Sequence, residues 1–400
     1  MKNAGSLAAV RAANRAHIKQ VIYRCAPVTR TEVAARLGLT LPTVTTAVAD
    51  LLAQGVLAEA PLPDWAAGPQ GGRRPAALDF VPDAAFALGA ELGPYATTAV
   101  AVDVRGRVAA SSTAPAAAGS YEQMLTALAG QLSGLAAGLS GRSVLGAGVG
   151  LPGFVDTGAG VVRASSHAGW AGRPLAADLA ARLGMPVSID NNARMRVTAE
   201  QLFTTAPRPD VFAYYFVSRG IACPVQVQGG VWGGTTAGAG EIGHTIVQPG
   251  GPKCPRCGHH GCLDAVAGEG AILARCTRAL AENRAPGLAA RCIGRAPVIE
   301  DVLAAQADGD GDVNEILAQA IRWQGVSLAN IANLLSPGLV LVDSRLMAWP
   351  PNRRLLRQVT DHYLYGLNSG EIPLEFLPAD PLRGARGAAA RLVQSRWLEA

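Results

Sequence analysis

The sequence predicts a two-part chain, in which a winged helix-turn-helix over residues 1–80 precedes a larger α/β region. Three observations support this order. Two short helix patterns joined by a glycine turn fall before residue 55, and two strand-like pieces around a Pro/Gly-rich loop follow them. From residue 86 onward, strand patterns alternate with helix patterns. A chain of 400 residues is too long for one ordinary domain and fits two or three.

Composition and charge narrow the class of protein. Hydrophobic residues make up 49% of the chain and charged residues 16%, which allows large cores and argues against global disorder. The net charge of +5 is mild, but residues 1–60 hold seven Lys/Arg and only three acids, a local excess of +4. The basic balance is therefore a property of the first part of the chain, as nucleic-acid binding there would require.

The chain shows neither a secretory signal pattern in its first 20 residues nor an apolar run of about 20 residues, so we expect no membrane partner. Seven cysteines are an odd number, and three of them fall within nine residues. Such clustering favours a metal over disulfides and a reducing compartment. We therefore expect a cytoplasmic protein.

The first part of the chain carries clear helix boundaries. Residues 6–24 have helical hydrophobic spacing. A second, short helix begins at Thr29, which with Glu32 forms a capping box, and it ends at Gly38. A third helix begins at Thr40. Two short helices joined by a tight glycine-containing turn are typical of a helix-turn-helix.

Double-stranded DNA is the partner that this pattern favours. The N-terminal residues of the second helix of such a motif reach base edges in the major groove. The residues in that position are Thr40, Pro42, Thr43, Thr45 and Thr46. The strand-like pieces Val56–Ala60 and Ala76–Val81 flank a loop with Arg73 and Arg74, which reads as a basic wing able to follow the DNA backbone. The alternative is an ordinary helix pair with a solvated basic face.

The remainder of the chain predicts α/β layers. The strands are expected at 86–93, 97–103, 107–111, 144–153, 186–190, 211–217, 223–228 and 339–343, and the helices at 121–139, 174–183, 265–280, 313–334 and 384–399.

A cluster of metal-binding residue types lies in the second half of the chain. Its members are His244, Cys254, Cys257 and Cys262. Three thiolates and one imidazole are a common closed tetrahedral set for structural zinc, which would hold loops together rather than activate water. His259 and His260 are rival ligands, ranked lower because they fall between Cys257 and Cys262. The other cysteines, at 25, 223, 276 and 292, are scattered and fit small core positions.

Together these motifs resemble the ROK family, which contains sugar kinases and sugar-responsive repressors. The resemblance covers nearly the whole chain and rests on VGLPGFVD (149–156), PVSIDNNARMRVTAE (186–200), AGEIGH (239–244), CPRCGHHGCLD (254–264) and SLANIANLLSPGLVLVD (327–343). Residues 1–80, with GGRRP at the wing, resemble the head of the family's N-acetylglucosamine-type and xylose-type repressors. The resemblance implies an actin-like ATPase fold of two lobes. The first lobe comprises residues 81–190 and is completed by the C-terminal helix 384–400, and the second lobe comprises residues 191–383 and contains the zinc loop.

The resemblance also implies a sugar site. Position by position, the family's sugar-binding residues fall on Gly153, Asn191, Asn192, Glu241, His244 and Asp264. Carboxylates, amides and an imidazole suit sugar hydroxyls, which both donate and accept hydrogen bonds. His244 can bind the sugar with one nitrogen and zinc with the other. Asp264 departs from the usual Glu, and the Cys-x-x-Cys spacing departs from the usual Cys-x-Cys.

The kinase parts of the family do not carry over. The first phosphate loop, normally Asp-x-Gly-Gly-Thr, reads Glu-Leu-Gly-Pro-Tyr at 91–95, and the second, at 218–224, has lost its Gly-Thr-Gly pattern. Asp343-Ser344 replaces glycines on the nucleoside side. Asn192 takes the place of the catalytic aspartate, and an amide cannot act as a general base. The sequence therefore predicts no kinase activity.

These features predict a homodimeric or dimer-of-dimers repressor of carbohydrate genes, controlled by a sugar or sugar-phosphate effector. Arg163, Arg173 and Arg194 are candidates to contact a phosphate, with a surface arginine as the alternative for each. Two rival functions stay open at this point. One is an active ATP-dependent sugar kinase with an appended DNA-binding head, and the other is a DNA-binding protein whose large domain only dimerises.

Overall fold

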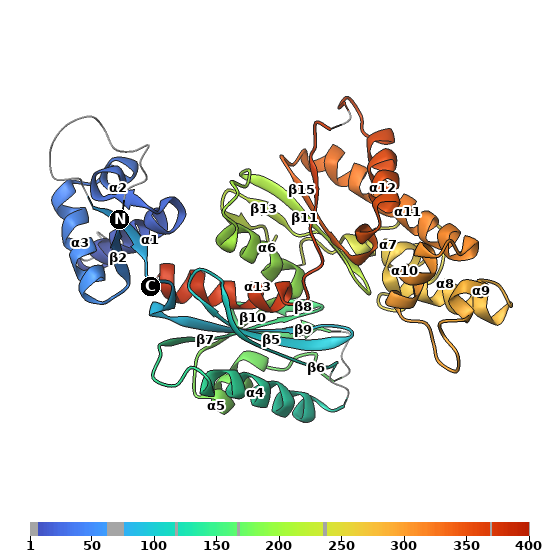
Figure 1. Cartoon of the computed structure of the whole chain (residues 1–400), viewed down its shortest axis with the longest axis horizontal. Helices are drawn as coiled ribbons and strands as arrows, with labels where there is room; N and C mark the ends of the chain where they lie inside the picture. Colours follow the sequence, from blue (N-terminus) through green and yellow to red (C-terminus); the bar gives the residue numbers. More distant parts are fainter. Residues whose placement is uncertain are drawn as a thin grey trace.

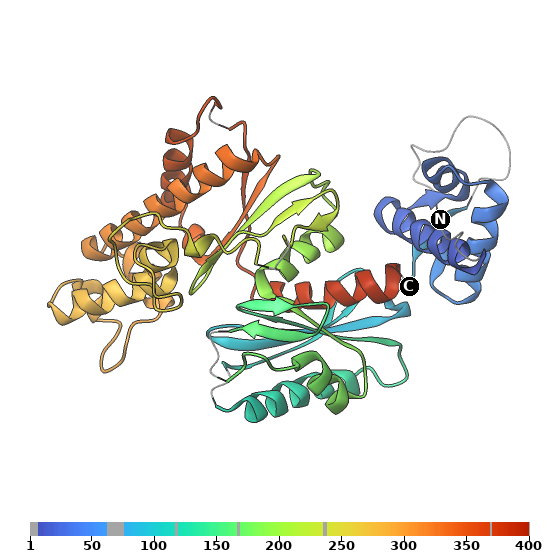
Figure 2. The ribbon, with the colours of Figure 1, turned by 180° about the vertical axis from the view of Figure 1, so that it is seen from behind.

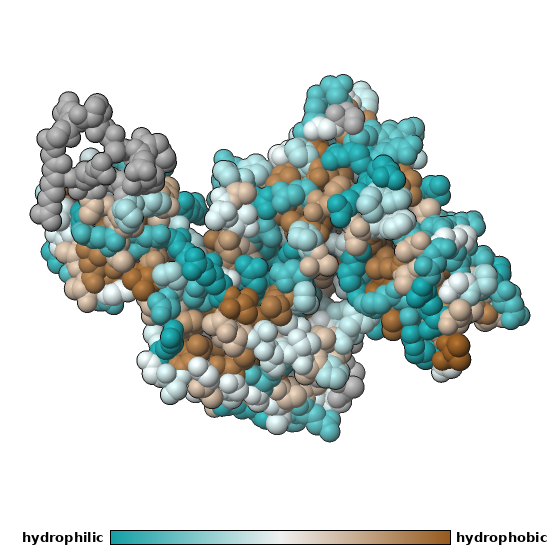
Figure 3. Space-filling model, in the orientation of Figure 1, coloured by the Kyte–Doolittle hydropathy of each residue, from teal (hydrophilic) through white to brown (hydrophobic). Residues whose placement is uncertain are grey.

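The computed structural model describes residues 7–61, 76–116, 119–165, 169–234, 238–368 and 370–399. Figures 1 and 2 show an N-terminal helical head beside two α/β lobes, with the C-terminal helix lying on one lobe and ending next to the head. The head, the first lobe and the second lobe each surround a β-sheet of their own. On the face drawn in Figure 3, hydrophobic residues lie in scattered patches between hydrophilic ones.

The head contains three helices among its described residues and a small sheet of strand order β1-β3-β2. Its elements are α1 (Leu7–Cys25), β1 (Val28–Thr29), α2 (Arg30–Leu37), α3 (Leu41–Ala53), β2 (Leu57–Ala60) and β3 (Ala77–Phe80). The expected capping box is present, because the Thr29 side chain accepts from the backbone of Glu32 and the Glu32 carboxylate accepts from Thr29. Gly38 ends α2 in the left-handed conformation, and Thr40 caps α3. The two-residue strand β1 was not predicted.

The first lobe is built on a five-stranded sheet of order β10-β7-β4-β5-β6. Its strands are β4 (Phe86–Leu92), β5 (Ala96–Asp103), β6 (Val108–Pro115), β7 (Val144–Leu151) and β10 (Val187–Asn191). Strands β4, β7 and β10 are parallel, and β5 and β6 are antiparallel. Helices α4 (Tyr121–Ala137) and α5 (Leu175–Leu183) cover one face of this sheet, and α13 (Arg383–Leu392) covers the other (Figure 1). The hairpin β8 (Phe154–Asp156) and β9 (Val161–Ala164) lies beside it.

The second lobe surrounds a six-stranded sheet in which β11 and β15 form a parallel centre. Its strands are β11 (Val211–Val217), β12 (Ile221–Ala222), β13 (Val225–Val227), β14 (Gly230–Val231), β15 (Val340–Ser344) and β16 (Leu374–Phe376). Helix α6 (Asn192–Phe203) packs on one face. The other face carries the largest core, from α7 (Leu263–Ala267), α8 (Glu269–Ala281), α9 (Pro286–Ala289), α10 (Ile299–Ala307), α11 (Gly311–Leu335) and α12 (Pro350–His362).

The structure corrects three element predictions. The single helix expected at 265–280 is two helices, because Gly268 is extended and the next residue, Glu269, donates its backbone N–H to Ser218 instead of continuing the helix. The strand expected at 223–228 is shorter, and β12 precedes it. The C-terminal helix changes to π-helical turns at Val393–Leu398. Helices α6, α9, α10 and α12 and the short strands β8, β9, β14 and β16 had not been predicted.

The C-terminal end ties the head to the first lobe. Trp397 and Leu398 pack into the core of the head, and Lys19 of α1 donates to the backbone carbonyl of Trp397. The Tyr23 hydroxyl donates to the carbonyl of Val104 at 2.7 Å. Burial, with Arg15 nearby, lowers the pKa of Lys19 to about 8. The head is therefore fixed by contacts, and not only by the chain that leads into β4.

None of the helices within the described ranges is both long enough and apolar enough to cross a membrane.

Candidate functional site

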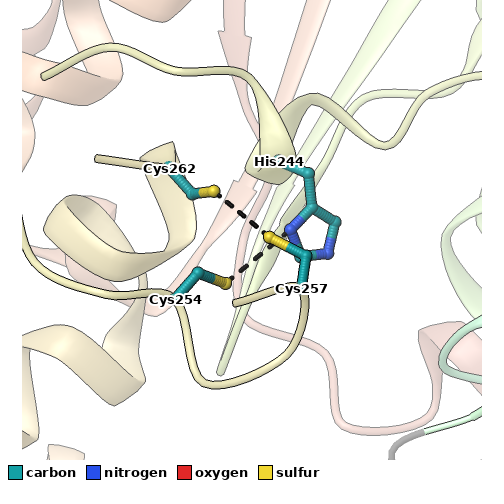
Figure 4. A group of neighbouring side chains, drawn as sticks. All are labelled: His244, Cys254, Cys257 and Cys262. Carbon is teal, nitrogen blue, oxygen red and sulfur yellow. Dashed lines mark hydrogen bonds between the residues drawn. The ribbon is translucent and has the colours of Figure 1, made fainter. Parts of the chain in front are cut away.

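Four of the predicted metal ligands lie together in the second lobe. His244 ends the short 3₁₀ turn Ile242–His244, Cys254 and Cys257 stand in the following loop, and Cys262 caps α7. Figure 4 shows the four side chains pointing toward one another. The ligand atoms all lie within 4.8 Å of one another, with 3.8 Å between Cys254 Sγ and His244 Nδ1 and 3.4 Å between Cys257 Sγ and Cys262 Sγ.

This arrangement fits a tetrahedral ion. Zinc–sulfur bonds of about 2.3 Å place the ligands of a tetrahedron about 3.8 Å apart. The rival His260 is engaged elsewhere, because its Nδ1 lies 3.0 Å from the carbonyl oxygen of Gly251. His259 lies outside the group of four.

The backbone of the loop holds these ligands in place. Gly261 precedes Cys262 with φ +79°, and a Cβ there would stand 1.7 Å from the carbonyl oxygen of Gln248, so only glycine fits. The amide of Cys254 donates to the carbonyl of His259 at 2.7 Å. The His259 amide, which faces the Cys257 sulfur, lowers the pKa of Cys257 to about 6, whereas burial raises the pKa of Cys262 to about 12. A bound cation would convert all three thiols to thiolates.

The predicted sugar-binding residues from four segments lie beside this loop. Asn191 ends β10 and caps α6, and its Nδ2 donates to the carbonyl of Gly153 at 3.0 Å and to Glu241 at 3.5 Å. Burial raises the pKa of Glu241, against the opposing effect of Arg256. Burial likewise raises the pKa of Asp264, whose Oδ1 accepts from the backbone of Ile221 at 2.7 Å.

Asn192 forms its side-chain hydrogen bonds with residues outside the other five. Its Nδ2 donates to Glu91 Oε1 at 3.0 Å, and its Oδ1 accepts from the amide of Ala193. Asn192 thus contacts Glu91, which lies in the segment predicted to correspond to the first phosphate loop.

Arg256 was missed by the sequence reasoning. Its guanidinium lies 3.3 Å from His244 Nε2, 3.7 Å from Asp264 Oδ2 and 3.8 Å from Glu241 Oε2. The only signal for it was the extra residue between Cys254 and Cys257.

A buried network of charges fills the region of the first phosphate loop. Arg196 of α6 donates to both carboxylate oxygens of Glu91 at 2.6 and 2.7 Å, and to Asp343 at 2.9 Å. Asp343 also accepts from Tyr214 at 2.6 Å and from Arg383 at 3.0 Å. Burial by itself would lower the pKa of Arg196, but Glu91 and Asp343 raise it above its usual range. The network joins β4, α6, β15 and α13.

A second contact joins the two lobes beside it. Tyr95, in the turn between β4 and β5, donates to Glu269 of α8 at 3.0 Å. Arg345 donates to both oxygens of the same carboxylate, at 2.8 and 3.2 Å, and stacks on the Tyr95 ring. The side chain of Glu269 is fully buried. The tyrosine of this turn therefore makes an interlobe contact.

The candidate phosphate-binding arginines have partners in the protein. Arg163 pairs with Asp156 at the surface, and Arg173 stacks on Tyr121. Arg194 pairs with Asp190 at 3.1 Å and its side chain is only 15% exposed, so the surface alternative was wrong for this arginine.

The predicted DNA-contacting residues of α3 are on the surface. Thr40, Pro42, Thr43, Thr45 and Thr46 are all exposed. The hydroxyls of Thr40 and Thr43 lie 2.8 Å apart, and Thr46 donates to the carbonyl of Pro42. The side-chain hydroxyl of Thr45 has no hydrogen-bond partner within the described part of the chain and is free to contact a ligand. Arg73 and Arg74 lie outside the described residues.

Comparisons with known proteins agree with this arrangement. A family model described as "ROK family" matches residues 87–395. The xylose repressor of Bacillus subtilis (strain 168) is 23% identical over 344 residues, which cover 86% of this chain and 84% of the relative.

Two solved structures share the fold. A ROK family transcriptional regulator, described as a homolog of the E. coli MLC protein, superposes with a TM-score of 0.82 at 21% identity, covering 98% of this chain and 97% of its own. The ROK hexokinase from Thermus thermophilus has a TM-score of 0.62 at 26% identity and covers 76% of this chain and 97% of its own. The two lobes thus have the actin-like fold of sugar kinases, and the regulator's fold extends over the head as well.

Proposed function

Because the chain belongs to the ROK family, we propose that it is a cytoplasmic transcriptional regulator, most simply a repressor of carbohydrate genes, whose DNA affinity is set by a sugar or sugar-phosphate effector. Its head is a winged helix-turn-helix that binds double-stranded DNA, and its two lobes hold the effector. The observation that carries the proposal is the polar N-terminus of α3, exposed on a head that the C-terminal helix fixes to a sugar-kinase-like body.

The DNA contact is proposed at the first turn of α3. Four exposed threonines and Pro42 surround this helix end, where the positive end of the helix dipole favours phosphate. Threonine also contacts base edges, and its methyl group packs on thymine. Arg73 and Arg74 are proposed to contact the DNA backbone from the wing.

The effector is proposed to bind where Gly153, Asn191 and Glu241 meet His244 and Asp264, with Asn192 at the edge. A buried and a half-buried carboxylate, together with an amide and an imidazole, fit a polyhydroxylated ring. Zinc bound to His244 and the three cysteines would crosslink the loop that presents these groups.

Helix α6 supports a route from this site to the head. Its first turn is capped by Asn191, while Leu202 near its other end packs with the cores of both the head and the first lobe. A ligand that binds one lobe arrangement more tightly shifts the position of this helix and of the head against it. We propose that two copies associate, so that paired heads bind the two halves of an operator.

Phosphoryl transfer is disfavoured by the buried charges. Arg196 and Glu91 already neutralise one another in the first phosphate loop, and Asn192 offers an amide where a base is required. We therefore propose no kinase activity. Release of ADP on incubation with ATP and a sugar would support the kinase alternative instead.

The test of the proposed function is fluorescence anisotropy with the DNA upstream of the protein's own gene, repeated with a panel of sugars and sugar phosphates. We expect DNA binding that weakens with rising salt and changes with one class of sugar. DNA binding that no sugar alters would leave the lobes with a dimerising role only. Absence of DNA binding even at low salt would contradict the assignment of the head.

Replacing Thr45 by glutamate is expected to lower DNA affinity by about tenfold or more, because a carboxylate replaces an exposed hydroxyl beside the DNA phosphates. Anisotropy titrations measure this change. Thr277→Glu places the same substitution at an exposed position of α8, in the second lobe, and should leave DNA affinity unchanged. Equal losses in the two variants would indicate a general charge effect and contradict the contact at α3.

A further inference from the structure

Arg256 extends from the loop between Cys254 and Cys257 toward the proposed effector site. Its guanidinium faces Glu241, His244 and Asp264, three residues of that site. The side chain is 38% exposed, so it borders both solvent and the two carboxylates. No other described basic side chain forms an ion pair with either Glu241 or Asp264.

The guanidinium is not seated on these carboxylates. Its contacts with Glu241 and Asp264, at 3.8 and 3.7 Å, are about 1 Å longer than a charge-assisted hydrogen bond. Arg196 shows how a direct pair looks in the same molecule, with 2.6 Å to Glu91. Asp264 Oδ2 has no hydrogen-bond partner, although the residue is only 8% exposed. The buried acceptor Asp264 Oδ2 and the guanidinium N–H donors of Arg256 therefore lie near one another without forming a hydrogen bond.

His244 adds a further donor to this corner. Its Nδ1 faces the Cys254 sulfur, so Nε2 carries the proton of the neutral imidazole when Nδ1 serves as a metal ligand. Nε2 then lies 3.3 Å from a guanidinium nitrogen of Arg256, and two donors at that distance do not bond to each other. Both are available to one shared acceptor.

Gly220 leaves the room that this arrangement needs. A Cβ at this position would stand 2.9 Å from Arg256 Nη1 and 2.8 Å from Asp264 Oδ2. A side chain there would displace the guanidinium or cover the unpartnered oxygen.

We infer that Arg256 is a specificity-determining residue of the effector site, which contacts a hydroxyl or acylated amine of a sugar and rejects free amino sugars. This inference rests on the proposed function. A hydroxyl oxygen accepts from Arg256 and His244 while its own O–H donates to Asp264 Oδ2, so that both the donors and the acceptor find a partner. An ammonium group has no lone pair for the two donors, and the guanidinium repels it.

The charge balance explains why Arg256 sets this preference. Glu241 and Asp264 together would attract an ammonium group if no cation stood between them. Arg256 supplies that cation from the protein. Removing its charge therefore weakens binding of neutral sugars and strengthens binding of their amino counterparts.

The experiment is calorimetric titration of the full-length protein with matched pairs of sugars: glucose and glucosamine, galactose and galactosamine, mannose and mannosamine. Xylose and N-acetylglucosamine complete the panel. Wild type, Arg256→Gln and Arg256→Lys are compared, with zinc content and DNA affinity without sugar as checks on folding. Arg256→Gln should lose about tenfold in affinity for the neutral sugar and gain about tenfold for the amino sugar relative to it. Arg256→Lys, which keeps the charge, should still reject the amino sugar.

The outcomes separate the two claims. If wild type binds no sugar of the panel, the proposed function fails and this inference fails with it. If wild type binds a sugar and Arg256→Gln binds it equally well with unchanged discrimination, only the inference is overturned. Tighter binding of the neutral sugar by Arg256→Gln also overturns it, because the arginine would then be a competitor for the site. Normal zinc content in both variants excludes a disturbed loop as the cause.

Discussion

Replacing Cys254 with serine is expected to remove the bound metal and to lower the free energy of unfolding by about 3 kcal/mol or more. Cys254 is 1% exposed and its sulfur lies 3.8 Å from His244 Nδ1, within the group of four ligand atoms. A serine hydroxyl is a poor ligand at neutral pH. The loop between His244 and Cys262 would then depend on its backbone hydrogen bonds alone.

Zinc per chain, measured by elemental analysis, and urea unfolding of the same samples check this prediction. Wild type should contain about one zinc ion per chain, and a chelator should destabilise it by as much as the substitution does. The matched control is Cys292→Ser, because Cys292 is also buried but stands outside the group of four. A Cys254→Ser variant with full zinc content, or a Cys292→Ser variant that loses zinc, would contradict the assignment of the ligands.

The parts of the structure that the sequence predicted well depend on local signals. The capping box of Thr29 and Glu32 and the left-handed Gly38 involve residues within one or two helical turns, so their spacing is visible in the sequence. The cysteines of the metal loop lie within nine residues, and only His244 had to be added from farther away. Such local patterns can be recognised in the sequence because they do not depend on how the rest of the chain packs.

The parts that could not be predicted depend on distant partners. Glu91 and Arg196 are 105 residues apart, and Arg196 and Asp343 are 147 apart. Each one alone resembles an ordinary helix or strand residue. The sequence predicted an altered first phosphate loop. It did not predict that Arg196 of α6 pairs with the carboxylate of Glu91 in that loop. Arg256 was missed for a different reason: its neighbours Glu241, His244 and Asp264 are near in the sequence, but they lie in a separate turn and in α7, and the sequence does not show how these pack against the loop.

Replacing Arg196 with methionine is expected to destabilise the protein by about 3–5 kcal/mol, because it leaves a buried carboxylate without its partner. Arg196 lies between Glu91 and Asp343 and is 7% exposed. Asp343 keeps Tyr214 and Arg383 as donors, but Glu91 keeps only the amide of Asn192. The cost therefore arises mainly at Glu91.

This asymmetry predicts a rescue. Glu91→Gln in the Arg196→Met background removes the unpaired charge, and the double variant should recover at least about half of the lost stability. Urea unfolding of the two single variants and the double variant gives the coupling energy. Arg163→Met is the matched control, since its exposed pair with Asp156 is expected to contribute about 0–1 kcal/mol.

The stabilities of the Arg196→Met and Arg163→Met variants also indicate what the buried network does between the two lobes. If Arg196→Met proves as mild as Arg163→Met, water reaches Glu91 and the network is not the closed interlobe contact that the distances indicate. If the loss is large and the double variant recovers it, the carboxylate and the guanidinium are held as a pair in the place of the family's first phosphate loop. A nucleoside triphosphate would then have to compete with a buried internal ion pair. This competition gives a physical reason why the two lobes would carry out no phosphoryl transfer, as proposed.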